Sequence, residues 1–163
     1  MARIMITCVL LSFTGLSFAS AEGNGMLKGA LKITAADNIK MIPGDVEEGI
    51  EFFHGSWSEA LKKSKKEDKL IFLDAMAAWC GPCKMMAAKT FTDKEVGEFF
   101  NKNFINFKMD MEKHDEGPRL SKKFGLRAYP SLYLLDENEE IIQHTLGYQD
   151  AKSLIEFGES GLE

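Results

Sequence analysis

The sequence predicts an α/β domain with a mixed β-sheet and helices on both faces. Three observations predict this class. Short runs of β-formers alternate with segments of helical periodicity, the last two strand-like runs are separated by a short polar turn, and 45% of the 163 residues are apolar. Helices between early strands indicate parallel crossovers, whereas a short turn indicates an antiparallel hairpin. We therefore expect one globular domain with a sizeable core.

The first half of this domain is predicted to alternate strands and helices. The expected elements are a strand at 49–53, a helix at 57–66, a strand at 70–75 and a helix at 83–89. Ser56 and Glu59 form a capping box, which marks the start of the first helix. The second strand is a nearly continuous run of apolar β-formers, which is typical of a strand buried on both faces.

The second half contains a helix, a strand, a helix, a hairpin and a last helix. The expected elements are a helix opening at Thr92, a strand at 104–110, a helix at 118–125, strands at 131–135 and 140–145, and a helix at 150–157. Thr92 and Glu95 form a second capping box. Pro118 starts the next helix and Gly125 lies just past its end, as these residues prefer.

The N-terminus is predicted to carry a secretory signal peptide over residues 1–21. The small residues Ala19 and Ala21 follow an apolar run and form a cleavage site. An uncleaved membrane anchor is the alternative, but glycine and hydroxyl residues dilute the run, and a spanning helix needs about 20 mainly apolar residues. We expect residues 22–48 to form an N-terminal extension, either ordered or a tether. The domain then covers 49–163, with no stable membrane span after cleavage.

The charge of the chain argues against nucleic acid as a partner. The net charge is −5, and the predicted signal peptide contributes one arginine and no acid. Phosphate binding depends on clustered Lys and Arg, which release counterions. The one basic run, at 62–66, falls on the first predicted helix and is followed by two acids, so we interpret it as a solvated face.

Cys80 and Cys83 are the two cysteines outside the predicted signal peptide, and they form a C-x-x-C motif. A disulfide framework would need more pairs. A structural zinc site needs four ligands, but there is no second motif and the three histidines are scattered without ligand spacing. Covalent haem attachment needs C-x-x-C-H, and Lys84 follows the motif here. The pair is therefore predicted to carry redox chemistry, with no metal and no cofactor.

The sequence WCGPCK at 79–84 resembles the active site of thioredoxins letter for letter. The resemblance extends over about 49–160 and implies a thioredoxin fold. It includes an acid six residues before the first cysteine, a strand lysine, a proline opening the hairpin and a glycine after it. These companions are Asp74, Lys108, Tyr129–Pro130 and Gly147.

Other segments are similar to a narrower group of proteins. SWSEALKKSKKEDK, TFTDKEV and KMDMEK resemble secreted bacterial thioredoxin-like proteins and the C-terminal domain of the transmembrane thiol:disulfide interchange protein. One position departs from thioredoxins, which have a tryptophan where this chain has Met76. The surface around the thiols is therefore expected to be less aromatic, and substrate preference does not carry over.

The chemistry of the pair follows from its position in the chain. A thiolate attacks a disulfide, and Cys80 is expected where a strand ends and a helix begins, so that backbone N–H groups stabilise its charge. Cys83, one helical turn deeper, is then expected to attack the mixed disulfide. The resemblance implies that a buried Asp74 takes or returns the Cys83 proton and that Lys108 tunes it. The alternative is that Asp74 lies at a strand edge and faces water.

The resemblance also implies a substrate groove beside the thiols. The Tyr129–Pro130 peptide bond is expected to be cis, with the backbone of Tyr129 pairing with an extended client segment. A trans proline at the start of a strand is the alternative. Trp79, Gly81 and Pro82 are expected to border the same groove.

The predicted function is an exported thiol:disulfide oxidoreductase, periplasmic or secreted, that reduces disulfides in cysteine-containing client proteins. Gly81 and Pro82 between the cysteines resemble the pair found in reducing thioredoxins. A reducing role in an oxidising compartment requires a membrane donor of electrons. An oxidant or isomerase is the alternative among enzymes, and a non-catalytic protein-binding module is the alternative from another class.

Overall fold

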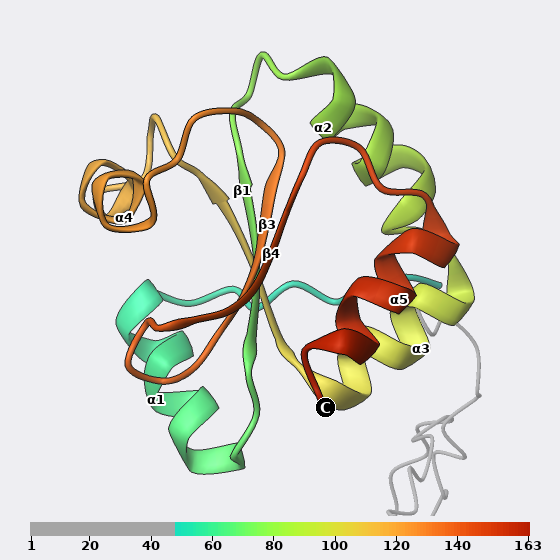
Figure 1. The fold of residues 1–163 in the computed structure, drawn as a ribbon, viewed down its shortest axis with the longest axis horizontal. Helices are drawn as coiled ribbons and strands as arrows, with labels where there is room; N and C mark the ends of the chain where they lie inside the picture. Colours follow the sequence, from blue (N-terminus) through green and yellow to red (C-terminus); the bar gives the residue numbers. More distant parts are fainter. Residues whose placement is uncertain (1–47) are drawn as a thin grey trace, which may run out of the picture. The chain divides into compact units, whose positions relative to one another are not determined.

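The computed structural model describes residues 48–163. The elements are, in chain order, α1 (Trp57–Glu67), β1 (Ile71–Met76), α2 (Gly81–Met85), the π-helix η1 (Met86–Thr90), α3 (Lys94–Asn103), β2 (Ile105–Asp110), α4 (Gly117–Phe124), β3 (Ser131–Leu135), β4 (Ile141–Leu146) and α5 (Ala151–Ser160). Figure 1 shows a central sheet with helices on both of its faces. The predicted α/β class is confirmed.

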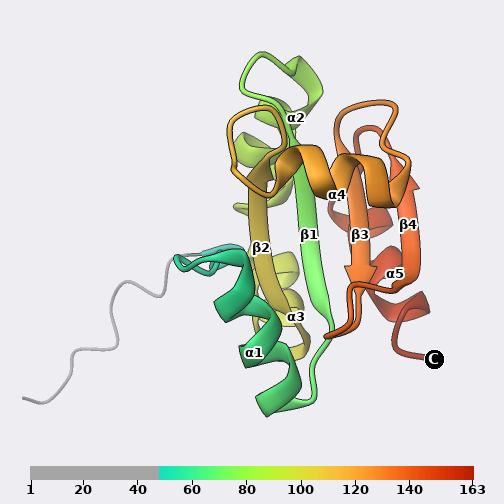
Figure 2. The ribbon, with the colours of Figure 1, turned by 90° about the vertical axis from the view of Figure 1, so that its left-hand side faces the viewer.

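The sheet has four strands in the order β2-β1-β3-β4, seen face-on in Figure 2. β1 pairs in parallel with β2 and antiparallel with β3, and β3 and β4 form the predicted antiparallel hairpin. The sheet is therefore mixed. β1 lies inside the sheet and is buried along residues 71–75, as its apolar sequence predicts.

Two apolar cores lie on opposite faces of the sheet. The core between the sheet and the helices α1 and α4 includes Trp57, whose ring lies edge-on to that of Phe107, with the ring centroids 5.2 Å apart. The face covered by α2, η1, α3 and α5 includes Phe72, with its ring 4.7 Å from that of Phe100. Side chains alternate along a strand, so Asp74 shares the second face with Phe72.

Residues 49–53, predicted as a strand, do not form one. A single backbone hydrogen bond, from the Phe53 N–H to the Asn106 carbonyl at 2.7 Å, joins this segment to β2. The side-chain amide of Asn101 binds two other backbone groups of this segment. It accepts a hydrogen bond from a backbone N–H and donates one to a backbone carbonyl, each at 2.9 Å. Amide partners from distant elements replace the strand ladder, and the segment's own sequence gives no sign of them.

The two predicted capping boxes have different outcomes. The box of Ser56 and Glu59 is present at α1 and is confirmed. The box of Thr92 and Glu95 is wrong, because Asp93 is the N-cap of α3 and its carboxylate accepts a backbone N–H at 3.1 Å. The Thr92 hydroxyl donates instead to two carbonyls of η1 at 3.2 Å. The carbonyl groups of η1 therefore bind the hydroxyl that the predicted capping box would have used.

Most remaining bounds agree with the predictions to within one residue, as β3 and α4 show, but α5 ends at Ser160, three residues beyond its predicted end. Within the part of the chain that the structure describes, no helix has the length and apolar character needed to cross a membrane. The predicted signal peptide at 1–21 and residues 22–47 of the predicted extension lie outside the described residues.

Candidate active site

Cys80 and Cys83 form a disulfide at the junction between β1 and α2, with their Cα atoms 5.4 Å apart. Cys80 is the N-cap of α2, so this helix begins at Gly81 rather than at the predicted Cys83. Pro82 lies in the first turn, where a missing N–H costs nothing. Beyond Met85 the helix widens into η1, a change for which the sequence carries no signal.

The sulfur of Cys80 accepts a hydrogen bond from the Cys83 backbone N–H at 3.1 Å. Both cysteines are buried and pack against Ala77 and Tyr129. A carbon atom added at the exposed Gly81 would meet nothing within 4 Å, so this position between the two cysteines faces open space. Within residues 48–163, no group of three His, Cys, Asp or Glu side chains is placed to hold a metal ion.

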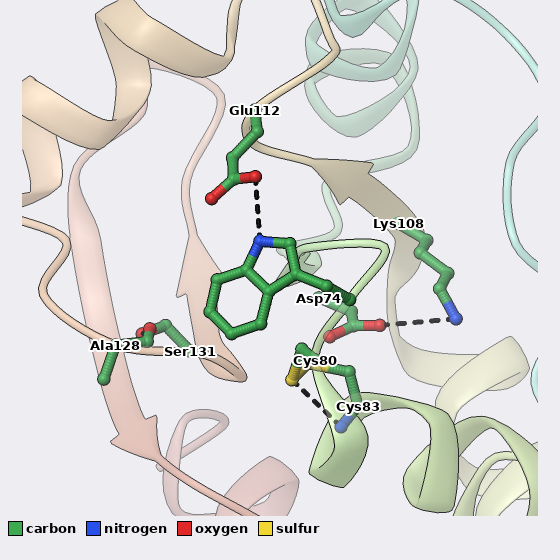
Figure 3. The surroundings of a disulfide bond; sticks show 8 residues. Asp74, Cys80, Cys83, Lys108, Glu112, Ala128 and Ser131 are labelled. Atoms are coloured by element: carbon green, nitrogen blue, oxygen red, sulfur yellow. Dashed lines mark hydrogen bonds and ion pairs between the residues drawn. A yellow bond between two sulfur atoms is a disulfide. The ribbon is translucent and has the colours of Figure 1, made fainter.

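Asp74 lies in β1, on the sheet face that α2 covers, and is 1% exposed. In Figure 3 its carboxylate lies between the Lys108 side chain and the disulfide. Among the described residues, neither carboxylate oxygen has a hydrogen-bond partner. Burial raises the pKa of Asp74 to about 6, and the Lys108 charge opposes that rise. The alternative in which this acid faces water is excluded by its burial.

Lys108 stands opposite Asp74 in the parallel pairing of β1 with β2, with its Nζ atom 3.7 Å from the carboxylate. At this distance the two groups form an ion pair and no direct hydrogen bond. The ammonium also lies 5.6 Å from the ring centre of Phe52 and 5.5 Å from that of Phe91. A hollow of about 370 Å³ borders this lysine, whose side chain is 30% exposed.

The Tyr129–Pro130 peptide bond is cis and directly precedes β3. Two hydrogen bonds hold the loop. The Ser131 hydroxyl donates to the Ala128 carbonyl at 2.8 Å, and the Gly147 N–H donates to the Pro130 carbonyl at 2.9 Å. Gly147 has a φ of 81°, a conformation that favours glycine, which explains this residue at the end of β4.

Trp79 precedes the disulfide and is 67% exposed. Its ring lies edge-on to that of Tyr129, with the centroids 5.8 Å apart. Its indole N–H donates to the Glu112 carboxylate at 2.9 Å, drawn in Figure 3. Sequence reasoning missed Glu112. The available signal was its position just after β2, because neighbouring parallel strands end at the same edge of a sheet.

The structure therefore brings together the residues singled out in the sequence. The disulfide, Trp79 and Tyr129 lie beside one another, and Asp74 and Lys108 form an ion pair. Met76, where thioredoxins have a tryptophan, is half-buried and packs against the cysteines.

Comparison with known proteins gives matches to thioredoxin-like proteins. A family model named Thioredox_DsbH, described as a protein of unknown function, DUF255, matches residues 45–125. A candidate disulphide-isomerase from Bacteroides thetaiotaomicron is 42% identical, with a TM-score of 0.63, over 71% of this chain and 95% of that one. The oxidised C-terminal domain of DsbD from Neisseria meningitidis is 28% identical, with a TM-score of 0.56, over 68% of this chain and 99% of that one.

The curated relatives include plant thioredoxins. Thioredoxin H4 from Arabidopsis thaliana is 35% identical over 85 residues, which are 52% of this chain and 66% of the relative. The chain spans about half to two thirds of the length of the first curated relatives it matches. The matches, the four-stranded mixed sheet and the Cys80–Cys83 disulfide agree with one another. The chain belongs to the thioredoxin superfamily of thiol:disulfide oxidoreductases.

Proposed function

We propose that this protein is an exported oxidoreductase that reduces disulfides in client proteins by cycling between the Cys80–Cys83 disulfide and the dithiol. One observation carries the proposal. The disulfide lies at the start of α2, and the buried Asp74 lies on the sheet face that this helix covers. A thiol pair and an acid with a raised pKa in such an arrangement suit two-step disulfide exchange.

In the first step the Cys80 thiolate attacks one sulfur of a client disulfide. A mixed disulfide forms, and the other client sulfur leaves as a thiolate. The N–H group that binds the Cys80 sulfur at 3.1 Å supports this thiolate. Gly81 and Pro82, which follow this cysteine in the chain, are exposed.

In the second step Cys83 attacks the sulfur of Cys80 and releases the second client thiolate. Burial raises the pKa of a thiol, so this attack is faster if a base accepts the Cys83 proton. Asp74 takes this role in the proposal and passes the proton on to the leaving sulfur. Two electrons thereby pass from the cysteine pair to the client disulfide, and Lys108 sets how readily Asp74 ionises.

The reducing direction rests on Gly81 and Pro82, because the residues between the thiols help to set the reduction potential. Thioredoxins lie near about −270 mV and strong periplasmic oxidants near about −120 mV. This gap corresponds to about 7 kcal/mol, which is more than a change such as Met76 is expected to reverse. In an oxidising compartment a pair of low potential needs an electron donor. The proposal therefore includes a dedicated membrane donor.

A redox titration tests the direction. The domain is equilibrated with glutathione buffers while the fluorescence of Trp79, beside the disulfide, is followed. We expect a midpoint near about −270 mV, and a midpoint above about −180 mV would contradict a reducing role. A Cys80→Ser variant cannot form the disulfide and should show no transition.

Isomerase activity is a second candidate, because the Bacteroides protein that is 42% identical is named as a candidate disulphide-isomerase. An isomerase is expected to titrate near about −180 mV and to restore activity to a scrambled client. The rate of insulin reduction in the presence of dithiothreitol distinguishes an enzyme from a non-catalytic protein-binding module. Equal rates for the wild type and Cys80→Ser would favour that module.

A further inference from the structure

The Lys108 ammonium lies beside the rings of Phe52 and Phe91, and neither ring has a part in the two exchange steps. We propose that these two phenylalanines are positioning residues, which hold the ammonium at its ion-pair distance from Asp74 and so control how readily that carboxylate accepts a proton from Cys83. This inference rests on the proposed function, because it names two determinants of the base in the second step.

The ammonium of Lys108 is held between a carboxylate and two aromatic rings. Its Nζ atom is 3.7 Å from the carboxylate of Asp74, 5.6 Å from the ring centre of Phe52 and 5.5 Å from that of Phe91. A cation within about 6 Å of a ring centre is attracted to the face of the ring. The ion pair is too long for a direct hydrogen bond, so the rings contribute to fixing the position of the ammonium.

The two rings come from segments that are far apart in the chain. Phe52 belongs to the segment 49–53, and Phe91 directly follows η1. The backbone N–H of Ile50 donates to the carbonyl of Phe91 at 2.7 Å, and the two rings lie edge-on with their centroids 5.4 Å apart. The ring of Phe91 is buried and also lies 6.2 Å from that of Phe72. Phe91 is therefore anchored in the core, and the half-buried Phe52 packs against it.

The surroundings of Lys108 offer its ammonium a second position. The hollow of about 370 Å³ is lined by both phenylalanines and by the exposed Glu48. Lysine has a flexible stem and a strongly hydrated ammonium, so loss of a ring favours movement toward water and this second acid. The ion pair is then weaker. Asp74 should hold its proton more tightly, because its buried carboxylate loses the charge that favours the ionised form.

Loss of a ring has another possible effect, which is opposite in sign. Water that enters beside Asp74 would stabilise the ionised carboxylate and loosen its hold on the proton. In the oxidised protein Lys108 is the charge that faces this carboxylate from β2, and the uncharged disulfide lies on its other side, as Figure 3 shows. The direction of the change therefore separates positioning of the ammonium from exclusion of water.

A set of variants tests both rings. Phe52→Leu removes the ring and keeps an apolar side chain, whereas Phe52→Tyr keeps a ring, and Phe91→Leu repeats the test at the second position. Phe53→Leu is the matched control, because this neighbouring ring belongs to the other core and lies 6.5 Å from that of Phe107. Lys108→Gln removes the ammonium, and its combination with Phe52→Leu closes a double-mutant cycle.

The first readout is an NMR titration of the Asp74 carboxyl carbon in the oxidised protein, which does not depend on activity. The variant Asp74→Asn identifies the signal. We expect Phe52→Leu and Phe91→Leu each to make Asp74 hold its proton about 3-fold more tightly, the change that a contact of about 0.7 kcal/mol represents. Phe52→Tyr and Phe53→Leu should match the wild type. In the Lys108→Gln background, Phe52→Leu should cause no further change.

The second readout is the pH dependence of release of the mixed disulfide, measured by rapid mixing with a peptide disulfide. The pKa of Asp74 is about 6 in the wild type. A proton held about 3-fold more tightly predicts release about 2-fold slower than in the wild type near pH 6, and an equal rate near about pH 8. A variant that only loosened the fold would slow release at both pH values.

Two results would overturn the proposal. One is an Asp74 proton held equally or less tightly in Phe52→Leu, which would show that the ring acts by excluding water or has no effect. The other is an equal effect of Phe52→Leu with and without Lys108, which would show that the ring does not act through the ammonium. Failure of the reducing function is a distinct result: the peptide is then exchanged only in the oxidising direction, while the carboxyl titration still tests both rings.

Discussion

At the scale of single residues, Asp74 is the group whose chemistry depends most on its surroundings. A carboxylate that is 1% exposed and has one cation at 3.7 Å is poorly solvated, and its pKa is accordingly raised to about 6. Neutral pH is above this pKa, so the Asp74 carboxylate is mostly ionised there and is able to accept a proton. The same burial that makes Asp74 a suitable base makes it unfavourable for folding.

Asp74→Asn is expected to stabilise the oxidised protein at neutral pH. The pKa of Asp74 is about 6 in the folded state against 3.8 ordinarily, so the folded protein holds this proton more tightly than the unfolded chain. The stability from this group is fully present below pH 3.8 and is lost as the pH rises through 6. Urea unfolding should show a gain of up to about 3 kcal/mol above pH 6 and almost none below 3.8. A gain that is equal at all pH values would contradict this explanation.

The same variant is expected to slow catalysis. Without a base for Cys83, release of the mixed disulfide should fall about 100-fold, while the first attack by Cys80 changes less. In the wild type, release should slow as the pH falls below about 6, and Asp74→Asn should lack this dependence. Rapid-mixing kinetics with a peptide disulfide measure both steps. Asp115→Asn, at an exposed acid after β2, is the control, and a wild-type release rate in Asp74→Asn would show that Asp74 is only structural.

At the scale of elements, Glu139 joins α1, α4 and the turn of the β3–β4 hairpin. Its carboxylate accepts the Trp57 indole N–H at 2.7 Å, two hydrogen bonds from Arg119 at 2.8 and 2.6 Å, and one from Lys123 at 3.1 Å. These partners lower its pKa to about 2, with Arg119 contributing most. The predicted polar turn is therefore also a connection between three elements.

Glu139→Ala is expected to lower the free energy of unfolding by about 1–3 kcal/mol, because the buried Trp57 N–H loses its acceptor. The contribution of the Glu139 charge is present above pH 4.5 and is lost as the pH falls toward 2. The loss caused by the substitution should therefore shrink in acid. Urea unfolding followed by tryptophan fluorescence measures it. The neighbouring exposed residue provides the control Glu140→Ala, and an equal loss in both variants would contradict this role.

At the scale of the whole molecule, the proposed function depends on where the protein works. The described residues 48–163 contain the cysteine pair, whereas the proposal of export rests on the sequence of residues 1–21. Ala19 and Ala21 have the spacing of a cleavage site.

Expression of the full chain in a bacterium with intact export tests this proposal. We expect the purified product to begin at or near Glu22, as found by intact-mass measurement, and to be recovered outside the cytoplasm. Substituting Ala19 and Ala21 by a larger residue should block processing and leave the longer chain. A product that keeps Met1 in the unsubstituted protein would contradict cleavage.

The sequence by itself determined the fold class, most elements and the residues of the disulfide. Local signals carry this information: β1 is a continuous apolar run, Ser56 and Glu59 cap α1, and the spacing of Cys80 and Cys83 limits their chemistry. Such signals depend on residues close together in the chain. They are therefore present before any tertiary contact forms.

Only the tertiary structure decided what depends on residues that are far apart in the sequence. Residues 49–53 do not form the predicted strand, because their backbone groups form hydrogen bonds with the side chain of Asn101 in α3. Glu112 became part of the site because the parallel pairing of β1 with β2 brings the turn after β2 next to Trp79. The burial and raised pKa of Asp74 arise from helices packed over it. Solvent exclusion and long-range hydrogen bonds belong to the packed chain, so no local pattern encodes them.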